Sequence, residues 1–213
     1  MNPSREWLAP LTGVAFVVVG IIGFIVGGEP KDADHPANEI VQWYVDNKSS
    51  AQVGAVMGVA AGLLLIFFGA YLRRFLQAAA GDRDVLSLVS FIGLVIVAVG
   101  FAIDGTILFA NAEAADNGVN PVAIQALQAL WDNDFLPLVL GVAAFLWATG
   151  ISIVRTAAFP RWLGWLMILL GVIAFTPIGF ASAIGAAILV LALSIALTLR
   201  ARATTPPPAA PAV

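Results

Sequence analysis

The chain has 213 residues, of which 61% are hydrophobic and 11% are charged, and its formal net charge is −3. Soluble domains carry about 45–50% apolar and about 25% charged residues, so this composition excludes a soluble α/β enzyme, a disordered protein and a disulfide scaffold. About 130 residues are hydrophobic, enough for six membrane helices of about 20 residues each. The acidic balance argues against nucleic acid as a partner, because nucleic acid requires a basic surface.

Missing residue types limit the chemistry. The chain has no cysteine and one histidine, His35, which excludes thiolate metal sites, cysteine nucleophiles and a bis-histidine haem held by one chain. Lys31 and Lys48 are the two lysines, and both lie outside the apolar segments. No lysine is therefore placed for a Schiff base within a bilayer, and we expect no cofactor.

Six apolar segments predict one transmembrane domain over residues 1–203. The predicted spans are 8–27, 52–72, 86–110, 135–154, 162–176 and 179–199. The first span is longer than the about 7–15 apolar residues of a signal-peptide core. We therefore expect residues 1–28 to be retained; cleavage would leave five spans. The last two spans come from one uncharged stretch that Pro177 and Gly179 divide. Residues 204–213 are rich in proline and alanine, which predicts a disordered tail.

The basic residues predict how the spans are oriented, because cytoplasmic loops of membrane proteins carry an excess of arginine and lysine. If both termini are cytoplasmic, only Lys31 and Lys48 lie outside. The arginines then all lie inside: Arg5, Arg73, Arg74, Arg83, Arg155, Arg161, Arg200 and Arg202. We therefore expect a multi-pass protein of the cytoplasmic membrane with both termini inside.

Two outer loops predict short helices that lie at the membrane interface, one around residues 36–47 and one around 120–133. In the second, Asn120 is placed to cap the helix and Pro121 to begin it. Its apolar stripe comprises Val119, Val122, Ala123, Ala126, Leu127, Leu130 and Trp131. We expect Trp43, Tyr44 and Trp131 at headgroup depth. The two loops share the spacing Gln-x3-Asp-Asn, through either an old duplication or, as we favour, chance.

Asp104 is the one charged residue within a predicted span. A charge inside a membrane is costly and marks a functional site by default. Asp104 is therefore either a proton or cation site, with Thr106 and Asn111 nearby on the same helix, or an acid near the interface that a neighbouring helix or water holds. We favour the second alternative, because no arginine, lysine or histidine accompanies Asp104 at membrane depth.

Other candidate residues are acidic, small or hydroxylic. Glu113, Asp116, Asp132 and Asp134 form an acidic outer cluster without the spacing of an EF-hand, so we expect no metal there. Gly54, Gly58 and Gly62 form a doubled GxxxG pattern that serves either packing within the bundle, which we favour, or homo-oligomerisation. The spans also contain hydroxyl groups without a base to activate them, those of Thr149, Ser152, Ser182, Ser194 and Thr198.

The junction between the fourth and fifth spans, residues 155–165, reads RTAAFPRWLGW. It resembles the R-T-x-x-x-P-R-W-L-G-W junction of small actinobacterial six-helix membrane proteins, a family described as a domain of unknown function. With the order of helices, the resemblance covers most of residues 8–199. It implies a six-helix integral membrane protein and brings no catalytic residues with it.

The sequence thus predicts an all-α, polytopic six-helix transmembrane bundle with two short interfacial outer helices. The leading functional hypothesis is a non-enzymatic membrane protein that binds lipid or a membrane-protein partner, including a second copy of itself. Two alternatives stay open. One is a small transporter or channel that uses Asp104 as a proton or cation site, and the other is a metal-dependent membrane enzyme.

Overall fold

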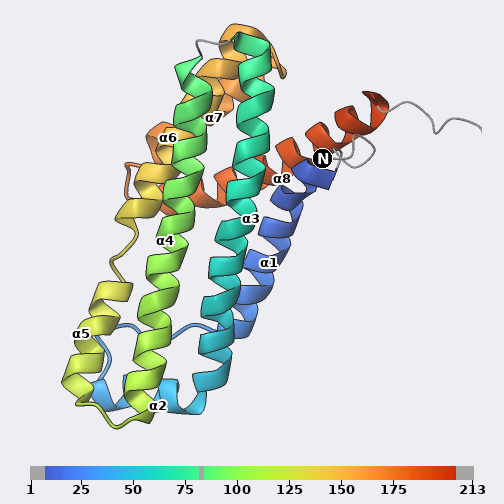
Figure 1. Cartoon of the computed structure of the whole chain (residues 1–213). Coiled ribbons are helices and arrows are strands. Elements are labelled where there is room, and N and C mark those ends of the chain that lie inside the picture. Colours follow the sequence, from blue (N-terminus) through green and yellow to red (C-terminus); the bar gives the residue numbers. More distant parts are fainter. Residues whose placement is uncertain (1–7, 82–83, 205–213) are drawn as a thin grey trace, which may run out of the picture.

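The structure, a computed structural model, describes residues 8–81 and 84–204. Within these ranges it is a bundle of α-helices without strands (Figure 1), so the predicted all-α fold is confirmed. The helices are α1 (Thr12–Gly27), α2 (Ala37–Asp46), α3 (Lys48–Ala80), α4 (Val85–Asp116), α5 (Pro121–Trp131), α6 (Leu136–Thr156), α7 (Arg161–Ile173) and α8 (Gly179–Thr204). Arg5, Arg83 and the predicted tail from residue 205 onward lie outside the described residues.

Five helical segments are long and apolar enough to cross a membrane, as in a multi-pass membrane protein. They are Leu8–Gly27, Lys48–Ala80, Val85–Asp116, Pro121–Thr156 and Gly179–Ala203. The predicted fifth span corresponds to α7, which has only 13 residues. At about 1.5 Å per residue, α7 is about 20 Å long, whereas the hydrocarbon core of a bilayer is about 30 Å thick.

Neighbouring helices pack side by side in the order α1, α3, α4, α6 and α7, and α8 packs against α1, α6 and α7. In Figure 1, α8 crosses the direction of α1, α3 and α4 obliquely near the start of α1. The side chain of Ser194 joins α8 to α1. Its hydroxyl donates to the carbonyl of Pro10 and accepts from the backbone N–H of Val14 at 3.1 Å.

Glycines set the close spacing between neighbouring helices. A Cβ placed on Gly54 of α3 would lie 2.9 Å from the carbonyl oxygen of Gly23 in α1 and closer still to the Cα of Gly27. Similar close approaches join Gly93 to Gly141 between α4 and α6, and Gly150 to Gly164 between α6 and α7. Small residues let membrane helices pack backbone to backbone, where dispersion forces replace the missing hydrophobic effect.

The two ends of the bundle differ in chemistry. The turn from α3 to α4 and the turn from α6 to α7 lie at one end (Figure 1), which we call the arginine end after Arg73, Arg74, Arg155 and Arg161. The helices α2 and α5 lie at the opposite end, which we call the α2–α5 end. Both lysines form ion pairs there, Lys31 with Glu39 and Lys48 with Glu113 and Asp116.

The helices predicted in the two outer loops are present as α2 and α5, and the predicted cap of α5 is confirmed. The Asn120 side chain accepts from the N–H of Val122 at 2.9 Å, and Pro121 begins the helix. Most of the α5 stripe faces outward; for example, Val122 and Leu130 are exposed. The Tyr44 side chain is fully buried between α2, α4 and α5, so it packs inside the protein instead of facing its surface. The headgroup depth of Trp43, Tyr44 and Trp131 stays a prediction.

The repeated Gln-x3-Asp-Asn spacing gives the same local hydrogen bonds in both places. Gln42 donates to Asp46 and Gln128 donates to Asp132, each at 2.8 Å. The asparagine that follows each aspartate donates to the backbone carbonyl four residues earlier, again at 2.8 Å in both segments. The shared spacing therefore ends α2 and α5 in the same way, whatever its origin.

Candidate functional site

Asp104 lines a cavity of about 180 Å³ between α1, α3 and α4. Trp131, at the end of α5, lines the same cavity, and Glu29 lies at its rim just after α1. The remaining wall is small or apolar: Gly20, Gly23, Phe24, Gly27, Gly28, Gly54, Ala55, Gly58, Ala61, Phe101 and Leu108. The cavity is therefore an apolar space with two carboxylates and no basic side chain in its wall.

The glycines of α1 and α3 explain why a space remains there. Gly54 lies against α1 and Gly62 against Ala98 of α4, so α3 is held close to both neighbours at these two positions. Gly58 lies one turn from each, and a Cβ placed on it would meet nothing within 4 Å. Gly54 and Gly62 therefore lie at close contacts between helices, whereas Gly58 borders the cavity.

The structure places the polar neighbours of Asp104 at the α2–α5 side of the cavity. The indole of Trp131 lies near the Asp104 carboxylate, and its buried Nε1–H makes no hydrogen bond within the described residues. The ion pairs of Lys31, His35 and Lys48 in the described part of the chain all involve other acids. Asp104 is therefore a half-buried carboxylate without a cationic partner there.

Thr106 and Asn111 do not share the Asp104 cavity. The Thr106 side chain is exposed on the opposite side of α4 and donates to the carbonyl of Ala102 at 2.6 Å. Asn111 is fully buried, and its amide donates to the Tyr44 hydroxyl at 3.3 Å. The three residues predicted as one polar site therefore have three different environments.

Tyr44 is the centre of a buried polar network that joins α2, α4 and α5. Its hydroxyl donates to Oε1 of Gln128 at 2.6 Å and accepts from Asn111. Gln128 in turn donates to Asp132, which accepts from the backbone N–H of Ala33 at 2.8 Å. Burial raises the pKa of the Tyr44 phenol. Burial thus favours the neutral phenol, and the network joins the α2–α5 end to the long helices.

The predicted acidic cluster is divided between two places. Glu113 and Asp116, at the end of α4, contact Lys48, and Gln52 also donates to Glu113. Asp132 belongs to the Tyr44 network, and Asp134 is half-buried beside it in the turn before α6. Among the described residues, no three histidine, aspartate or glutamate side chains are grouped to hold a metal ion.

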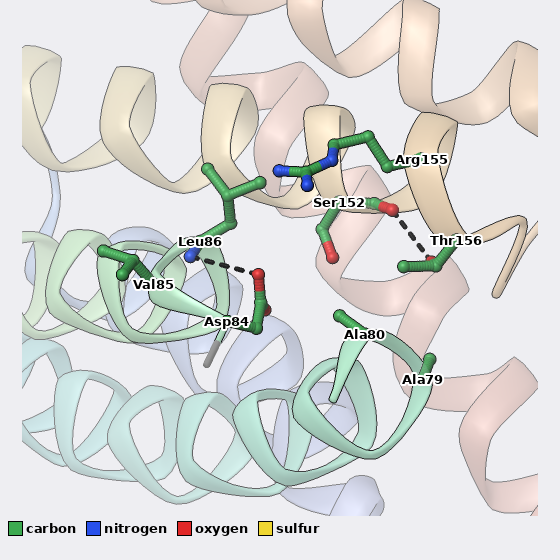
Figure 2. A pocket seen from close by; sticks show the side chains of 8 residues that line it. All are labelled: Ala79, Ala80, Asp84, Val85, Leu86, Ser152, Arg155 and Thr156. Atoms are coloured by element: carbon green, nitrogen blue, oxygen red, sulfur yellow. Dashed lines mark hydrogen bonds between the residues drawn. The ribbon is translucent and has the colours of Figure 1, made fainter. Parts of the chain in front are cut away.

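A second and larger cavity, of about 800 Å³, lies at the arginine end (Figure 2). It is bordered by the end of α3, the start of α4 and the last turn of α6, and its polar residues are Asp84, Ser152, Arg155 and Thr156. In the sequence, Arg155 indicated the orientation and began the 155–165 junction, and no pattern singled out Asp84. Asp84 is about seventy positions from Ser152, Arg155 and Thr156 in the sequence, so no local pattern indicates the cavity.

The hydroxyl groups within the spans serve mainly to join helices. Thr149 bonds to Ser90 of α4 at 2.7 Å, and Ser182 donates to the carbonyl of Leu170 in α7 at 2.7 Å. Thr198 donates to the carbonyl of Ser194. Ser152 differs from the others, because its Oγ is buried and has no hydrogen-bond partner within the described residues.

Comparison with known proteins returns no similar protein: no family model, no curated protein and no solved structure matches the chain.

Proposed function

We propose that this protein is a multi-pass membrane protein that binds a small cation at Asp104, in the cavity between α1, α3 and α4. The observation that carries the proposal is the wall of that cavity, which contains two carboxylates, Asp104 and Glu29, and no basic side chain. An acidic side chain within a membrane span is costly unless it pairs, so a cation that binds there would remove the cost.

The rest of the wall favours an organic cation over a bare metal ion. Calcium and magnesium need about six to eight oxygen ligands, whereas the cavity offers mostly glycine, alanine and aromatic surface. Phe24, Phe101 and Trp131 line it, and aromatic rings favour ammonium groups. A protonated amine or a small quaternary ammonium, with its charge near Asp104 and its carbon atoms against the glycines, suits this wall.

The proposal includes a topology. Six segments cross the cytoplasmic membrane, with both termini inside and the α2–α5 end outside, because Arg73, Arg74, Arg155 and Arg161 lie at the opposite end. α7, although short, crosses by local thinning of the bilayer and by burying Met167 and Gly171 against its neighbours. In this orientation Glu29 and Trp131 lie on the outer side of Asp104, so the cation enters from outside.

Binding of tetramethylammonium to the purified protein, measured by titration calorimetry, tests the proposal. We expect saturable binding by the wild type and at least about a tenfold weaker Kd for Asp104→Asn, since tenfold corresponds to about 1.4 kcal/mol. Gly58→Leu should also weaken binding, because its side chain would fill the cavity while Asp104 stays intact. Asp46→Asn, an exposed acid on α2, is the matched control and should bind like the wild type.

Wild-type protein that binds neither tetramethylammonium nor methylammonium, or an Asp104→Asn variant that binds both normally, would contradict the proposal. Proton flux into liposomes, measured alongside with a pH-sensitive dye, separates a carrier from a protein that only binds. Proton flux coupled to the cation, if Asp104→Asn abolishes it, supports a carrier. Cation binding without proton flux supports a receptor or a regulatory role.

The other functional hypotheses from the sequence depend on features outside the Asp104 cavity. A metal-dependent enzyme gains no support from the described residues, where the acidic side chains are divided between two places. The resemblance of residues 155–165 to small six-helix membrane proteins supports the six-span topology and adds no activity. The hypothesis of lipid binding depends on the cavity at the arginine end.

A further inference from the structure

The cavity at the arginine end is only partly enclosed. It lies between Ala79 and Ala80 at the end of α3, Asp84 and Leu86 at the start of α4, and the last turn of α6. Val85, which borders it, is 66% exposed. The cavity volume of about 800 Å³ falls within the about 300–1,000 Å³ of typical ligand sites. In a bilayer that α4 and α6 span, a cavity at the start of α4 and the end of α6 lies at the depth of lipid headgroups.

Ser152 is the polar group in this cavity that the protein leaves unsatisfied. Its side chain is 1% exposed, and its Oγ has no hydrogen-bond partner among the described residues. Figure 2 shows the hydroxyl pointing into the space between Asp84 and Ala80. A buried hydroxyl without a partner costs about 1–3 kcal/mol, so a ligand atom that bonds to Ser152 would recover that free energy.

The neighbouring polar side chains define what that ligand must carry. The Thr156 hydroxyl already has partners within the protein, because it donates to the carbonyl of Ser152 at 2.8 Å and accepts from the N–H of Ala158. Asp84 caps α4 by accepting from Leu86 and Ser87, and a carboxylate keeps further acceptor sites. Arg155 carries five donors, and no ion pair involves it in the described part of the chain.

Two opposite charges therefore line one cavity without pairing with each other. A simple anion would be repelled by Asp84, and a simple cation would be repelled by Arg155. A ligand with a phosphate and a primary ammonium a few bonds apart would meet both: the phosphate would accept from Arg155 and Ser152, and the ammonium would donate to Asp84. Arginine is well suited to phosphate, because its planar guanidinium makes two parallel hydrogen bonds.

We propose that this cavity binds a phosphoethanolamine-type headgroup, a phosphodiester with a primary ammonium, presented by a membrane phospholipid. The exposed apolar surface of Val85 beside the cavity favours the lipid as its source, since acyl chains can continue along that surface. This inference does not rest on the Asp104 site, which lies toward the opposite end of the bundle and uses different residues.

Native mass spectrometry of the protein released from nanodiscs tests the headgroup site. The nanodiscs contain equal amounts of phosphatidylethanolamine and phosphatidylcholine, whose quaternary ammonium cannot donate a hydrogen bond. We expect the wild type to retain the ethanolamine lipid preferentially. Arg155→Gln should retain at least about tenfold less of both lipids than the wild type, because a charge-assisted hydrogen bond contributes about 1.5–3 kcal/mol. Arg161→Gln, in the first turn of α7 and outside the cavity, is the matched control and should retain lipid like the wild type.

Two further variants separate the roles of the side chains. Asp84→Asn keeps a good helix cap but loses the charge, so it should retain both lipids equally. Ser152→Ala should retain several-fold less lipid while its thermal unfolding midpoint in lipid-free detergent does not fall. Equal retention of both lipids by the wild type, or equal losses in Arg155→Gln and Arg161→Gln, would overturn the proposal.

The source of the headgroup is tested by competition with soluble glycerophosphoethanolamine. If the lipid is the ligand, the soluble headgroup displaces it only at much higher concentration, because it lacks the acyl chains. Displacement at equal concentration would assign the site to a free solute and overturn the lipid as its source.

Discussion

At the scale of single residues, α3 shows how one repeated residue serves two purposes. Gly54 and Gly58 belong to the same GxxxG pattern and lie one turn apart. Gly54 lies against the backbone of α1, whereas nothing lies within 4 Å of a Cβ placed on Gly58. One glycine therefore allows a helix contact, and the other leaves room for the cavity that contains Asp104.

Alanine substitutions at these two positions should have opposite effects on stability. Gly54→Ala would force the Cβ into the backbone of Gly27, and we expect a loss of about 1–3 kcal/mol. Gly58→Ala meets no neighbour and gains helix propensity, so we expect no loss or a gain of up to about 1 kcal/mol. Unfolding free energies of both variants in the same detergent check this. Equal effects would show that α1 and α3 are not in backbone contact at Gly54.

At the scale of elements, α2 and α5 are fixed to the bundle by polar side chains and not only by apolar contact. Tyr44, Asn111 and Gln128 come from three helices and are all fully buried. Tyr44 and Gln128 are separated by 84 positions in the sequence. Trp43 and Tyr44 are adjacent aromatic residues in a loop, a pattern typical of an interface, so their sequence could not show that the Tyr44 hydroxyl has partners inside.

Tyr44→Phe should destabilise the protein by about 1–3 kcal/mol, because Gln128 and Asn111 would lose a buried partner. The matched control is Gln42→Ala on the exposed side of α2, which should change stability little. The measurement is the unfolding free energy of each variant at neutral pH. An equal effect of the two substitutions would contradict the importance of the network.

The raised pKa of Tyr44 also predicts the direction of a pH effect. The unfolded phenol ionises near pH 10, whereas the folded phenol stays protonated because burial raises its pKa. The unfolded state therefore binds fewer protons above about pH 10, and stability falls as the pH rises further. Tyr44→Phe should reduce this alkaline loss of unfolding free energy. An identical pH dependence in the wild type and the variant would contradict it.

At the scale of the whole molecule, hydropathy was sufficient to find the helices but not their contacts. The apolar segments are long and uninterrupted, so the sequence located the long helices and the break between α7 and α8 near Pro177. The helix ends differ from the predicted spans. α3, for example, continues to Lys48 and to Ala80, and its C-terminal extension contains arginine, leucine, glutamine and alanine, which favour helix. α8 is apolar around its whole circumference, so its sequence does not distinguish the faces that meet α1, α6 and lipid.

The two cavities also show that hydropathy does not reveal which residues come into contact. Hydropathy singled out Asp104 as a charge within a span. The sequence also marked Gly54, Gly58 and Trp131, but for other roles, and no pattern in it placed them or Glu29 around Asp104. Asp84 and Ser152 are an ordinary cap and an ordinary hydroxyl in sequence, and only the packing of α4 against α6 places them at one cavity.

The six-span topology can be tested directly, because the natural chain has no cysteine. Single substitutions Asn38→Cys in α2, Ala78→Cys near the end of α3 and Thr176→Cys after α7 report on different ends of the bundle. A membrane-impermeant maleimide should label Asn38→Cys and Thr176→Cys in intact cells, and Ala78→Cys only after lysis. Labelling of Thr176→Cys only after lysis would show that α7 does not cross.

The most direct test of the Asp104 site is to locate a bound cation. Tetramethylarsonium has the shape of tetramethylammonium and an arsenic atom that scatters anomalously. In crystals of the wild type soaked with it, we expect an anomalous peak beside the Asp104 carboxylate, between α1, α3 and α4, and no peak there in crystals of Asp104→Asn. A wild-type cavity without a peak, or a peak that persists in the Asp104→Asn crystals, would contradict a cation site at Asp104.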